Sequence, residues 1–275
     1  LAAAGVETER SVHLISQAMA LAFADRDRYL ADPAFTEVPV NGLLARDYVA
    51  QRSALIDEKR WPRSIVAGDP PRDDRSPRGA NIGPDVPSTS HFVAVDAQGN
   101  VASMTGTVQA PFGSFIMVDG FILNDELTDF AFVPSVAGVP VANRVEPGKR
   151  PRSSMAPTIV FKGRRPVMAY GSPGGATIIN SVFNVTLNLI DHGMGIQQAI
   201  DAPRLSVTSA AGTIACEGGE AFMQPRFSIA TQDVLRGLGH LGLGPAGSDG
   251  CLTTIGSVQG VVTDLRTGQR YGGAD

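Results

Sequence analysis

Apolar residues recur at helical spacing near the start of the chain. The spaced positions are Val12, Ile15, Met19 and Phe23. Steps of three and four residues place them on one side of a helix, so this side is expected to pack against a core. Asp32 precedes Pro33, and the residue before a proline is disfavoured in helical geometry. The pattern therefore predicts a helix over 9–30, and a second, weaker helical stretch is expected over 45–56.

Proline and arginine are frequent in the next segment, up to residue 88. Its prolines are Pro62, Pro70, Pro71, Pro77, Pro84 and Pro87, interleaved with Arg60, Arg63, Arg72, Arg75 and Arg78. This composition has too few apolar residues to offset the entropy lost on ordering. We therefore expect an extended, mobile linker that is open to cleavage and divides the chain into regions 1–88 and 89–275.

Strand patterns replace the helical pattern from Thr89 onward. A strand is predicted over 91–95, turn residues follow at 96–100, and 101–108 alternates small apolar with hydroxyl residues, as in a β-hairpin. Further strands are predicted over 115–118, 121–123, 158–162, 167–170, 256–263 and 269–271, helices over 176–192 and 196–200, and a long loop over 133–151. Hairpins that alternate with long helices predict an α+β fold in which helices cover a sheet.

The first hairpin brings two threonines together. A loop of Ala97, Gln98 and Gly99 pairs Asp96 with Asn100, so the numbers of paired residues sum to 196 and Thr89 falls opposite Thr107. Directly opposite side chains have Cβ atoms about 5 Å apart, close enough for one hydroxyl to orient the other. Cross-strand threonine pairs are also common without any catalytic role, because threonine favours strands.

The position of Thr89 favours a catalytic interpretation. A threonine hydroxyl is a weak nucleophile unless a base is adjacent, and the α-amine of an N-terminal threonine can be that base. Thr89 is internal, yet it lies where the linker meets the first strand, so cleavage between Ser88 and Thr89 would create such an N-terminus. The same hydroxyl can cut this bond by attacking the preceding carbonyl and forming an ester.

Three further groups have chemistry that suits a charged substrate. Glycines and small residues at 171–175 lie between a predicted strand and helix, where exposed N–H groups attract an anion. The hydroxyls and guanidinium groups at 150–155 suit a carboxylate, and the acidic residues Glu126 and Asp129 suit an ammonium group. The alternatives are a tight packing turn at the glycines and solvated surface at the other two.

Composition excludes several other functions. The net charge is −4 with scattered basic residues, which disfavours nucleic acid. Apolar stretches are too short to cross a bilayer. The four histidines are far apart in sequence and the chain has only Cys216 and Cys251, so we identify no metal or cofactor motif. Two cysteines cannot form a disulfide framework, and we expect them to be two buried thiols.

Taken together, these segments resemble the γ-glutamyltransferase (γ-glutamyltranspeptidase) family of N-terminal nucleophile hydrolases. The resemblance covers nearly the whole chain. It is carried by motifs at 24–33, 89–92, 96–100, 112–114, 123–130, 149–158, 171–175 and 202–204.

The resemblance implies a precursor that cuts itself before Thr89 into a large and a small subunit, which stay associated in an αββα layered sandwich. Region 1–88 resembles only the end of the large subunit and 89–275 the small, catalytic one, so we expect the sandwich to be incomplete in this chain. The family's carboxylate-binding arginine then lies outside it, and the remainder of the large subunit is an expected partner.

The resemblance also implies roles for individual residues. Thr89 would be nucleophile and base, with Thr107 orienting it. Gly174 and Gly175 would form the oxyanion hole. The other predicted contacts are Ser153 and Ser154 to the donor's α-carboxylate, and Gln109, Glu126 and Asp129 near its α-amine. The implied reaction is attack on a γ-glutamyl amide such as glutathione, followed by water or an amino acid acceptor.

Two substitutions depart from the family pattern. Ser90 stands where threonine is usual, and Gln109 stands where asparagine or glutamate is usual. Two alternatives accompany the leading interpretation: an amidohydrolase similar to cephalosporin acylases, and a catalytically silent domain that lacks the family's arginine and is never processed. Asp129 and the serine pair fit an amino acid donor and favour the γ-glutamyl reaction over the acylase. The resemblance further predicts a periplasmic or secreted location.

Overall fold

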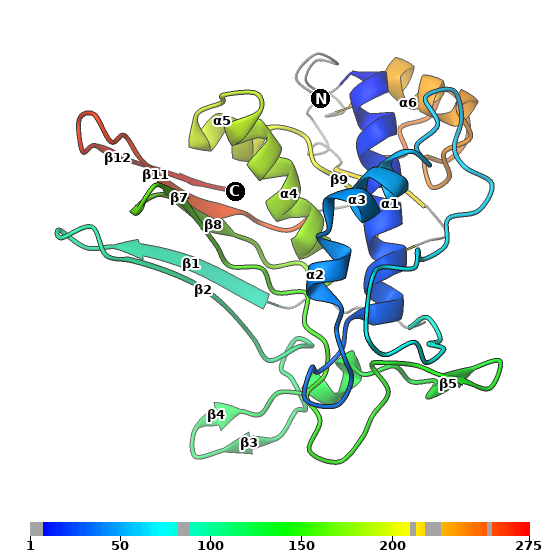
Figure 1. Cartoon of the computed structure of the whole chain (residues 1–275). Helices are drawn as coiled ribbons and strands as arrows, with labels where there is room; N and C mark the ends of the chain where they lie inside the picture. Colours follow the sequence, from blue (N-terminus) through cyan, green and yellow to red (C-terminus); the bar gives the residue numbers. More distant parts are fainter. Residues whose placement is uncertain (1–7, 82–88, 210–212, 218–226, 252–254) are drawn as a thin grey trace.

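The computed structural model describes residues 8–81, 89–209, 213–217, 227–251 and 255–275 (Figure 1). Its helices are α1 (Glu9–Tyr29), α2 (Val40–Leu43), α3 (Arg46–Ser53), α4 (Thr177–Ile190), α5 (Ile196–Asp201), α6 (Ile229–Gly237) and a 3₁₀ turn at Glu126–Asp129. The helices predicted over 9–30, 45–56, 176–192 and 196–200 are confirmed as α1, α3, α4 and α5. Helices α2 and α6 have no counterpart among the predicted elements.

The strands include all the predicted ones, together with two short pairs that were not predicted. They are β1 (Thr89–Val95), β2 (Val101–Thr107), β3 (Met117–Val118), β4 (Phe121–Ile122), β5 (Ser135–Val136), β6 (Val139–Pro140), β7 (Thr158–Lys162), β8 (Arg165–Gly171), β9 (Leu205–Ser206), β10 (Ala215–Cys216), β11 (Gln259–Thr263) and β12 (Arg270–Ala274). An antiparallel sheet has the order β12-β11-β8-β7. The loop expected over 133–151 is wrong in part, because β5 and β6 form a short hairpin there.

Three layers build the region around this sheet. Helices α4 and α5 lie on one face and the β1–β2 hairpin lies on the other (Figure 1). Side-chain alternation along β8 explains the arrangement, because neighbouring residues point to opposite faces. Tyr170 points to α4, where its hydroxyl is 2.7 Å from Oγ1 of Thr186. Gly171 lies against His91 of β1 on the other face. A mixed α/β fold with helices covering a sheet is therefore confirmed.

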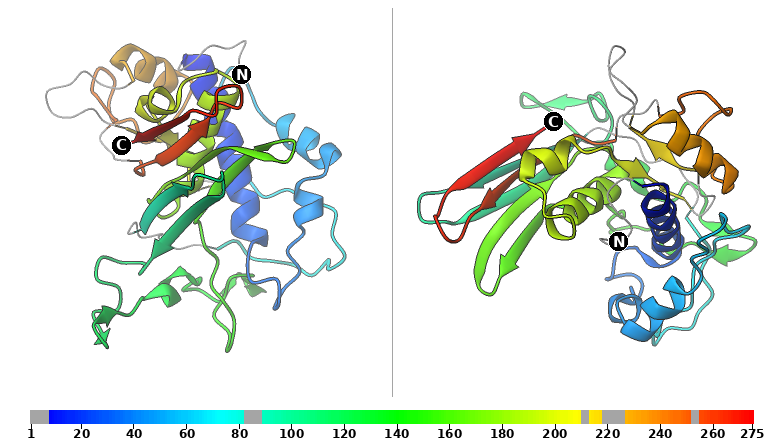
Figure 2. Two further views of the ribbon diagram at one scale, coloured as in Figure 1. Left: turned by 90° about the vertical axis from the view of Figure 1, so that its left-hand side faces the viewer. Right: turned by 90° about the horizontal axis from the view of Figure 1, so that it is seen from above.

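A second body of packed residues surrounds α1. Seen from above, α4 and α5 lie between the sheet and α1 (Figure 2). The buried side of α1 includes the predicted Val12, Ile15 and Met19, and it packs with β9, β10 and α6. Thr8 starts the helix, since its hydroxyl accepts from the N–H of Ser11 at 3.2 Å.

The two cysteines lie in this second core as a disulfide. Cys216 and Cys251 are both buried, as expected, but they are bonded to each other with Cα atoms 4.7 Å apart. The prediction of two free thiols is therefore wrong. Residues 35 apart in sequence are brought together by the packing of β10, and sequence spacing alone does not reveal this approach.

Much of the proline- and arginine-rich segment packs on α1, contrary to expectation. Ile65 is buried in the core around α1. The guanidinium groups of Arg72 and Arg78 lie 5.2 and 5.8 Å from the ring centre of Tyr29, and both side chains are 5% exposed. Stacked arginine stems supply the contact area that apolar residues would otherwise give. The prediction of an unpacked linker is therefore wrong over 57–81; residues 82–88 lie outside the described part.

Within the described ranges, none of the helices combines the length and the apolar content that crossing a bilayer requires.

Candidate active site

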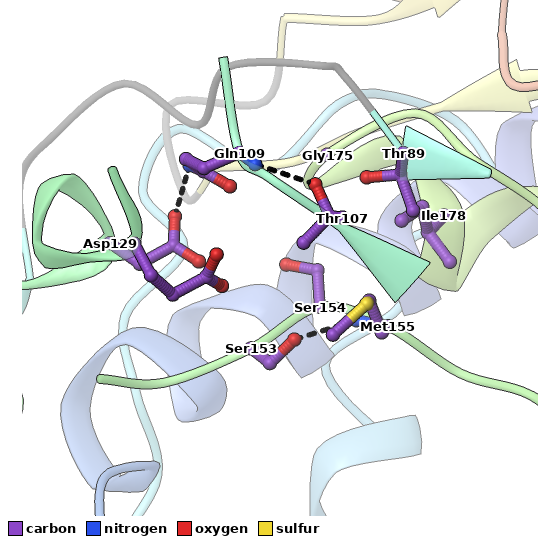
Figure 3. Close-up of a pocket in the computed structure, with 10 residues that line it drawn as sticks. Thr89, Thr107, Gln109, Asp129, Ser153, Ser154, Met155, Gly175 and Ile178 are labelled. Carbon is purple, nitrogen blue, oxygen red and sulfur yellow. Dashed lines mark hydrogen bonds between the residues drawn. The ribbon is translucent and has the colours of Figure 1, made fainter. Parts of the chain in front are cut away.

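One pocket collects most of the residues predicted to act together (Figure 3). Its lining residues are Thr89, Thr107, Gln109, Glu126, Asp129, Ser153, Ser154, Met155, Gly175 and Ile178. These residues come from both strands of the first hairpin, the 3₁₀ turn, the segment before β7 and the start of α4. Gly174 adjoins the lining, and Ser88 lies outside the described residues.

The register of the first hairpin is the one predicted from the length of its turn. Thr89 pairs with Thr107 and Val95 with Val101, so every pair sums to 196. Both threonines line the same pocket and therefore share one face of the hairpin. The Thr107 hydroxyl accepts from the N–H of Gln109 at 2.8 Å, which orients it at the end of β2. The hydrogen bond between the two threonine hydroxyls stays a prediction.

His91 fixes the hairpin against the sheet. Its Nδ1 is 2.8 Å from Oγ1 of Thr105, directly across the pair of strands. The ring lies so close to Gly171 that a Cβ at that position would collide with it. Glycine at 171 is therefore required for the approach of the two layers. Burial lowers the pKa of His91 below its usual range, so the ring is neutral at physiological pH. No pattern in the sequence assigns His91 this role.

The glycine turn ends β8 and begins α4. Gly174 and Gly175 have φ of +133° and +58°, values that favour glycine. Their carbonyls accept from the N–H groups of Thr177 and Ile178, which starts the helix. Among the described residues, the N–H groups of Gly174 and Gly175 have no hydrogen-bond acceptor. Two such donors beside the helix N-terminus suit a developing oxyanion.

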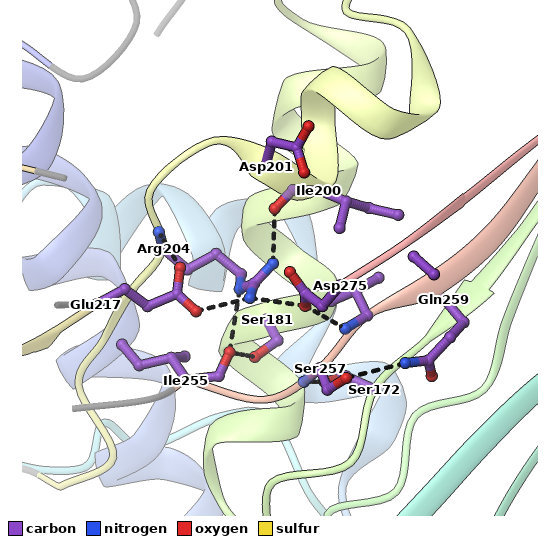
Figure 4. Close-up of polar contacts among 12 residues, drawn as sticks. Ser172, Ser181, Ile200, Asp201, Arg204, Glu217, Ile255, Ser257, Gln259 and Asp275 are labelled. Carbon is purple, nitrogen blue, oxygen red and sulfur yellow. Dashed lines mark hydrogen bonds and ion pairs between the residues drawn. The ribbon is translucent and has the colours of Figure 1, made fainter. Parts of the chain in front are cut away.

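A buried network supports this turn from behind (Figure 4). Ser172 donates to the carbonyl of Pro173 at 2.6 Å and accepts from the N–H of Ser257 at 3.1 Å. Arg204, which is almost fully buried, donates to the carbonyl of Ile255 at 3.0 Å and to Glu217 at 2.6 Å. Segment 255–257 is thus held on one side by Arg204 and supports the glycine turn on the other.

Carboxylates and an amide form another wall of the pocket. The backbone of Gln109 is in the left-handed region with φ +77°, a strained conformation for this residue type. This turn directs its buried side chain toward Asp129, whose Oδ1 accepts from Nε2 of Gln109 at 2.5 Å. Asp125 accepts from the N–H of Ala110 at 2.9 Å and so fixes the chain that follows Gln109.

Glu126 and Asp129 lie one helical turn apart in this wall. Burial raises the pKa of Glu126 above its usual range, while a hydrogen bond with Asp129 acts in the opposite direction. Two neighbouring carboxyl groups favour either a shared proton or a bound cation. An ammonium group of a ligand would satisfy both.

Ser153 and Ser154 lie across the pocket from Asp129 (Figure 3). Oγ of Ser153 accepts from the N–H of Met155 at 3.2 Å. The adjacent Arg152 donates to Asp27 at 3.1 Å and to the carbonyl of Arg26 at 3.2 Å, which anchors the serine segment on α1. The pocket therefore places hydroxyls on one side and acidic groups on the other, with Thr89 beside the glycine turn.

The whole chain, residues 1–275, matches the family model for gamma-glutamyltranspeptidase. It is 38% identical over 275 residues to the glutathione hydrolase proenzyme of Bacillus subtilis subsp. natto, which covers 96% of this chain and 43% of that protein. The chain thus spans less than half the length of the first curated relatives it matches.

Solved structures give the same class of protein. A γ-glutamyltranspeptidase mutant from Helicobacter pylori aligns with a TM-score of 0.55 at 32% identity, over 67% of this chain and 97% of that one. A cephalosporin acylase from Bacillus halodurans aligns with a TM-score of 0.77 at 26% identity, over 98% of this chain and 44% of that one. These matches define an N-terminal nucleophile hydrolase. Within this class, the chain belongs to the γ-glutamyltranspeptidase family.

Proposed function

We propose that this chain carries the catalytic part of a γ-glutamyl acyltransferase/hydrolase that acts on glutathione and other γ-glutamyl amides. The observation that carries the proposal is the composition of one pocket. It combines a hydroxyl at the head of a strand, an acidic wall and a pair of serines. A γ-glutamyl group has matching parts: an amide carbonyl, an α-amine and an α-carboxylate.

The reaction would follow from these positions. After a cut before Thr89, its free α-amine takes the hydroxyl proton and Oγ attacks the γ-carbonyl carbon. The N–H groups of Gly174 and Gly175 stabilise the oxyanion. The C–N bond then breaks, the proton passes to the leaving amine, and a γ-glutamyl ester on Thr89 remains. Water or the amine of an acceptor attacks this ester and restores the hydroxyl. No cofactor takes part in the scheme.

The same hydroxyl would perform the initial cut between Ser88 and Thr89. Its attack on the carbonyl of Ser88 forms an ester in place of the peptide bond, and water then hydrolyses it. Thr89 begins β1 and is paired to Thr107, so the nucleophile belongs to a fixed strand. This arrangement supports a precursor divided into the regions 1–88 and 89–275.

The remainder of the large subunit is the proposed partner. The outer side of the β1–β2 hairpin exposes Phe92 and Met104, which are 52% and 54% exposed, and the β3–β4 hairpin exposes Met117 and Phe121. Large exposed apolar groups of this kind mark an interaction surface. Coverage of the hairpin by a further helical layer would complete an αββα sandwich.

An oxidising location, periplasmic or extracellular, agrees with the disulfide between Cys216 and Cys251. Disulfides persist outside the reducing cytoplasm and are rare within it.

A cephalosporin-acylase-like amidohydrolase is the second candidate, supported by the alignment with the Bacillus halodurans acylase. Such a donor carries an acyl chain in place of the amino acid. The acidic wall at Glu126 and Asp129 favours a donor that bears an ammonium group, and therefore the γ-glutamyl reaction. A catalytically silent domain is the third candidate.

The full-length precursor, incubated and analysed by mass spectrometry, tests the proposal. We expect a cut between Ser88 and Thr89, followed by release of p-nitroaniline from γ-glutamyl-p-nitroanilide. Thr89→Ala should stay intact and inactive. Ser90→Ala is the matched control, because Ser90 is the exposed neighbour on the other face of β1, and it should be cut and active.

Three outcomes would contradict the proposal. Faster turnover of a glutaryl amide than of the γ-glutamyl donor would favour the acylase. An intact wild-type chain with no turnover would favour the silent domain. Cutting at the same rate in Thr89→Ala would exclude Thr89 as the cleaving nucleophile.

A further inference from the structure

Arg26 lies directly behind one of the pocket serines. This residue is in the last turn of α1 and its side chain is 7% exposed. Its Nη2 donates a hydrogen bond to Oγ of Ser154 at 2.5 Å. Arg26 does not line the pocket itself, so Ser154 stands between its guanidinium group and the pocket interior.

The guanidinium group is held from several sides. Its central carbon Cζ lies 5.3 Å from the ring centre of Phe23, and Nη1 is 3.7 Å from Oδ1 of Asp27. Arg152 donates to the carbonyl of Arg26 and to the same Asp27 carboxylate. The end of α1 and the serine segment are therefore tied together at Arg152, two residues before Ser154, as well as at Ser154 itself. This fixes the geometry of the Arg26 contact.

The direction of this hydrogen bond determines what Ser154 can offer a ligand. A hydroxyl has one proton to donate and two lone pairs that accept, whereas a guanidinium group can only donate. Ser154 must therefore accept from Arg26, and its own proton is directed elsewhere. Ser153 likewise accepts from the N–H of Met155, which leaves its proton for another acceptor. Both serines thus present O–H donors, which suits a carboxylate.

We infer that Arg26 is a positioning residue for recognition of the donor's α-carboxylate. It orients the Ser154 hydroxyl as a donor and places a fixed positive charge about 5 Å from the bound carboxylate, one hydroxyl away. The inference rests on the proposed function, because it assigns the serine pair to the α-carboxylate. It adds a charged group from α1 to a site otherwise built from region 89–275.

The test compares two donors in the processed full-length enzyme. γ-Glutamyl-p-nitroanilide carries the α-carboxylate, and 4-aminobutyryl-p-nitroanilide lacks it but keeps the amine. Arg26→Gln should raise KM for the first donor about tenfold or more, with kcat changed far less. Its kcat/KM for the second donor should stay within about twofold of wild type. Arg26→Lys should recover part of the loss.

Arg28→Gln is the matched control, since Arg28 is in the same turn but its guanidinium group lies over the ring of Tyr29. Arg28→Gln should leave the ratio of the kcat/KM values for the two donors unchanged. Ser154→Ala removes the acceptor without altering α1, and it should give the same selective loss as Arg26→Gln. Combining the two substitutions should add little further loss, because both act through one contact.

Equal losses for both donors in Arg26→Gln would overturn the inference and leave the proposed function standing. Additive losses in the double variant would also overturn it. If the processed wild type turned over neither donor, the proposed function would fail, and the inference would fail with it. Should Arg26→Gln not fold, Ser154→Ala and Arg26→Lys are compared with wild type on both donors. A loss of kcat/KM confined to γ-glutamyl-p-nitroanilide supports the inference, and equal losses for the two donors overturn it.

Discussion

The pocket has two parts that are built in different ways. We call the residues proposed to react the reactive wall, namely Thr89, Thr107, Gly174 and Gly175. Those proposed to bind the donor are the binding wall, namely Gln109, Glu126, Asp129, Ser153 and Ser154. Repeated backbone hydrogen bonds of strands and a helix start position the reactive wall. Single contacts of side chains on irregular segments position the binding wall.

This difference separates chemistry from specificity. A slip of one residue in a strand pair turns its side chains to the other face, so the reactive geometry tolerates little change. A loop contact can be exchanged one residue at a time. We therefore expect changes in the reactive wall to lower kcat, and changes in the binding wall to alter KM and its dependence on pH.

The largest effect is expected from Gly174→Ala in the reactive wall. An added Cβ would be 2.5 Å from Oγ1 of Thr177 and 3.2 Å from Cα of Gly256, so the turn must shift. Loss of an aligned oxyanion donor typically lowers kcat about 100-fold or more. Steady-state kinetics of the processed enzyme should show this loss with a much smaller change in KM.

Gly163→Ala is the control for backbone strain alone. Gly163 also has positive φ, +64°, but an added Cβ would meet nothing within 4 Å. Thermal unfolding of the two variants measures the shared cost of the left-handed conformation. An equal loss of kcat in both would refute a specific role of Gly174.

Thr107→Val should have the next largest effect. It keeps the shape and strand preference of the residue but removes the hydroxyl opposite Thr89, and we expect kcat to fall about tenfold or more. The N–H of Gln109 loses its acceptor, so the free energy of unfolding should fall by about 1 kcal/mol. Stopped assays and chemical denaturation measure the two effects.

Thr105→Val is its matched control. Thr105 lies on the same face of β2 but contacts His91 instead of the pocket. It should reduce stability without a comparable reduction in kcat. If Thr105→Val lowered kcat as much as Thr107→Val, the predicted pairing of hydroxyls would lose its support.

Glu126→Gln should give the smallest effect, and one that depends on pH. Burial raises the pKa of Glu126 above its ordinary value of 4.5. The stability that this group contributes is therefore complete below the ordinary pKa and is lost as the pH rises through the raised one. Glu126→Gln should accordingly be slightly more stable than wild type at neutral pH and equal to it near pH 4.

The donor's binding should change in the opposite sense. In the wild type, KM should rise as the pH falls through the raised pKa, because the neutral carboxyl no longer attracts the ammonium group. In Glu126→Gln this rise should be absent and KM at neutral pH a few-fold higher. Melting temperatures and KM values measured over the same pH series check the two predictions. If KM depended on pH in Glu126→Gln as it does in the wild type, Glu126 would be excluded as the titrating group.

The elements that sequence predicts well are those with a regular period. Helix α1 follows the spacing of its apolar residues, and the register of β1 and β2 follows from one turn of three residues. The pairing of Thr89 with Thr107 is therefore predictable from the length of that turn alone. The anion site at Gly174 and Gly175 is predicted from glycines that precede a helix, and it stays a prediction. Within the described ranges, the N–H groups of these two glycines have no acceptor.

What sequence did not reveal depends on contacts between distant segments. Arg26 and Ser154 are 128 residues apart, and no local pattern links them. Arginines that are typical of a mobile linker are instead packed on Tyr29, because a guanidinium group can stack on an aromatic ring as an apolar side chain would. The disulfide escaped prediction for the same reason.

The packing on Tyr29 limits how far the chain before Thr89 can move. Arg72 and Arg78 attach their segment to α1, and the N–H of Asn81 donates to the carbonyl of Asp27 at 2.8 Å. From Asn81 to the bond before Thr89 the chain can span at most about 25–30 Å. If that bond is cut as proposed, the new carboxyl end stays within this reach of Asn81 and therefore at a high local concentration. Separation of the two pieces would require unpacking of Tyr29 and of the core around α1.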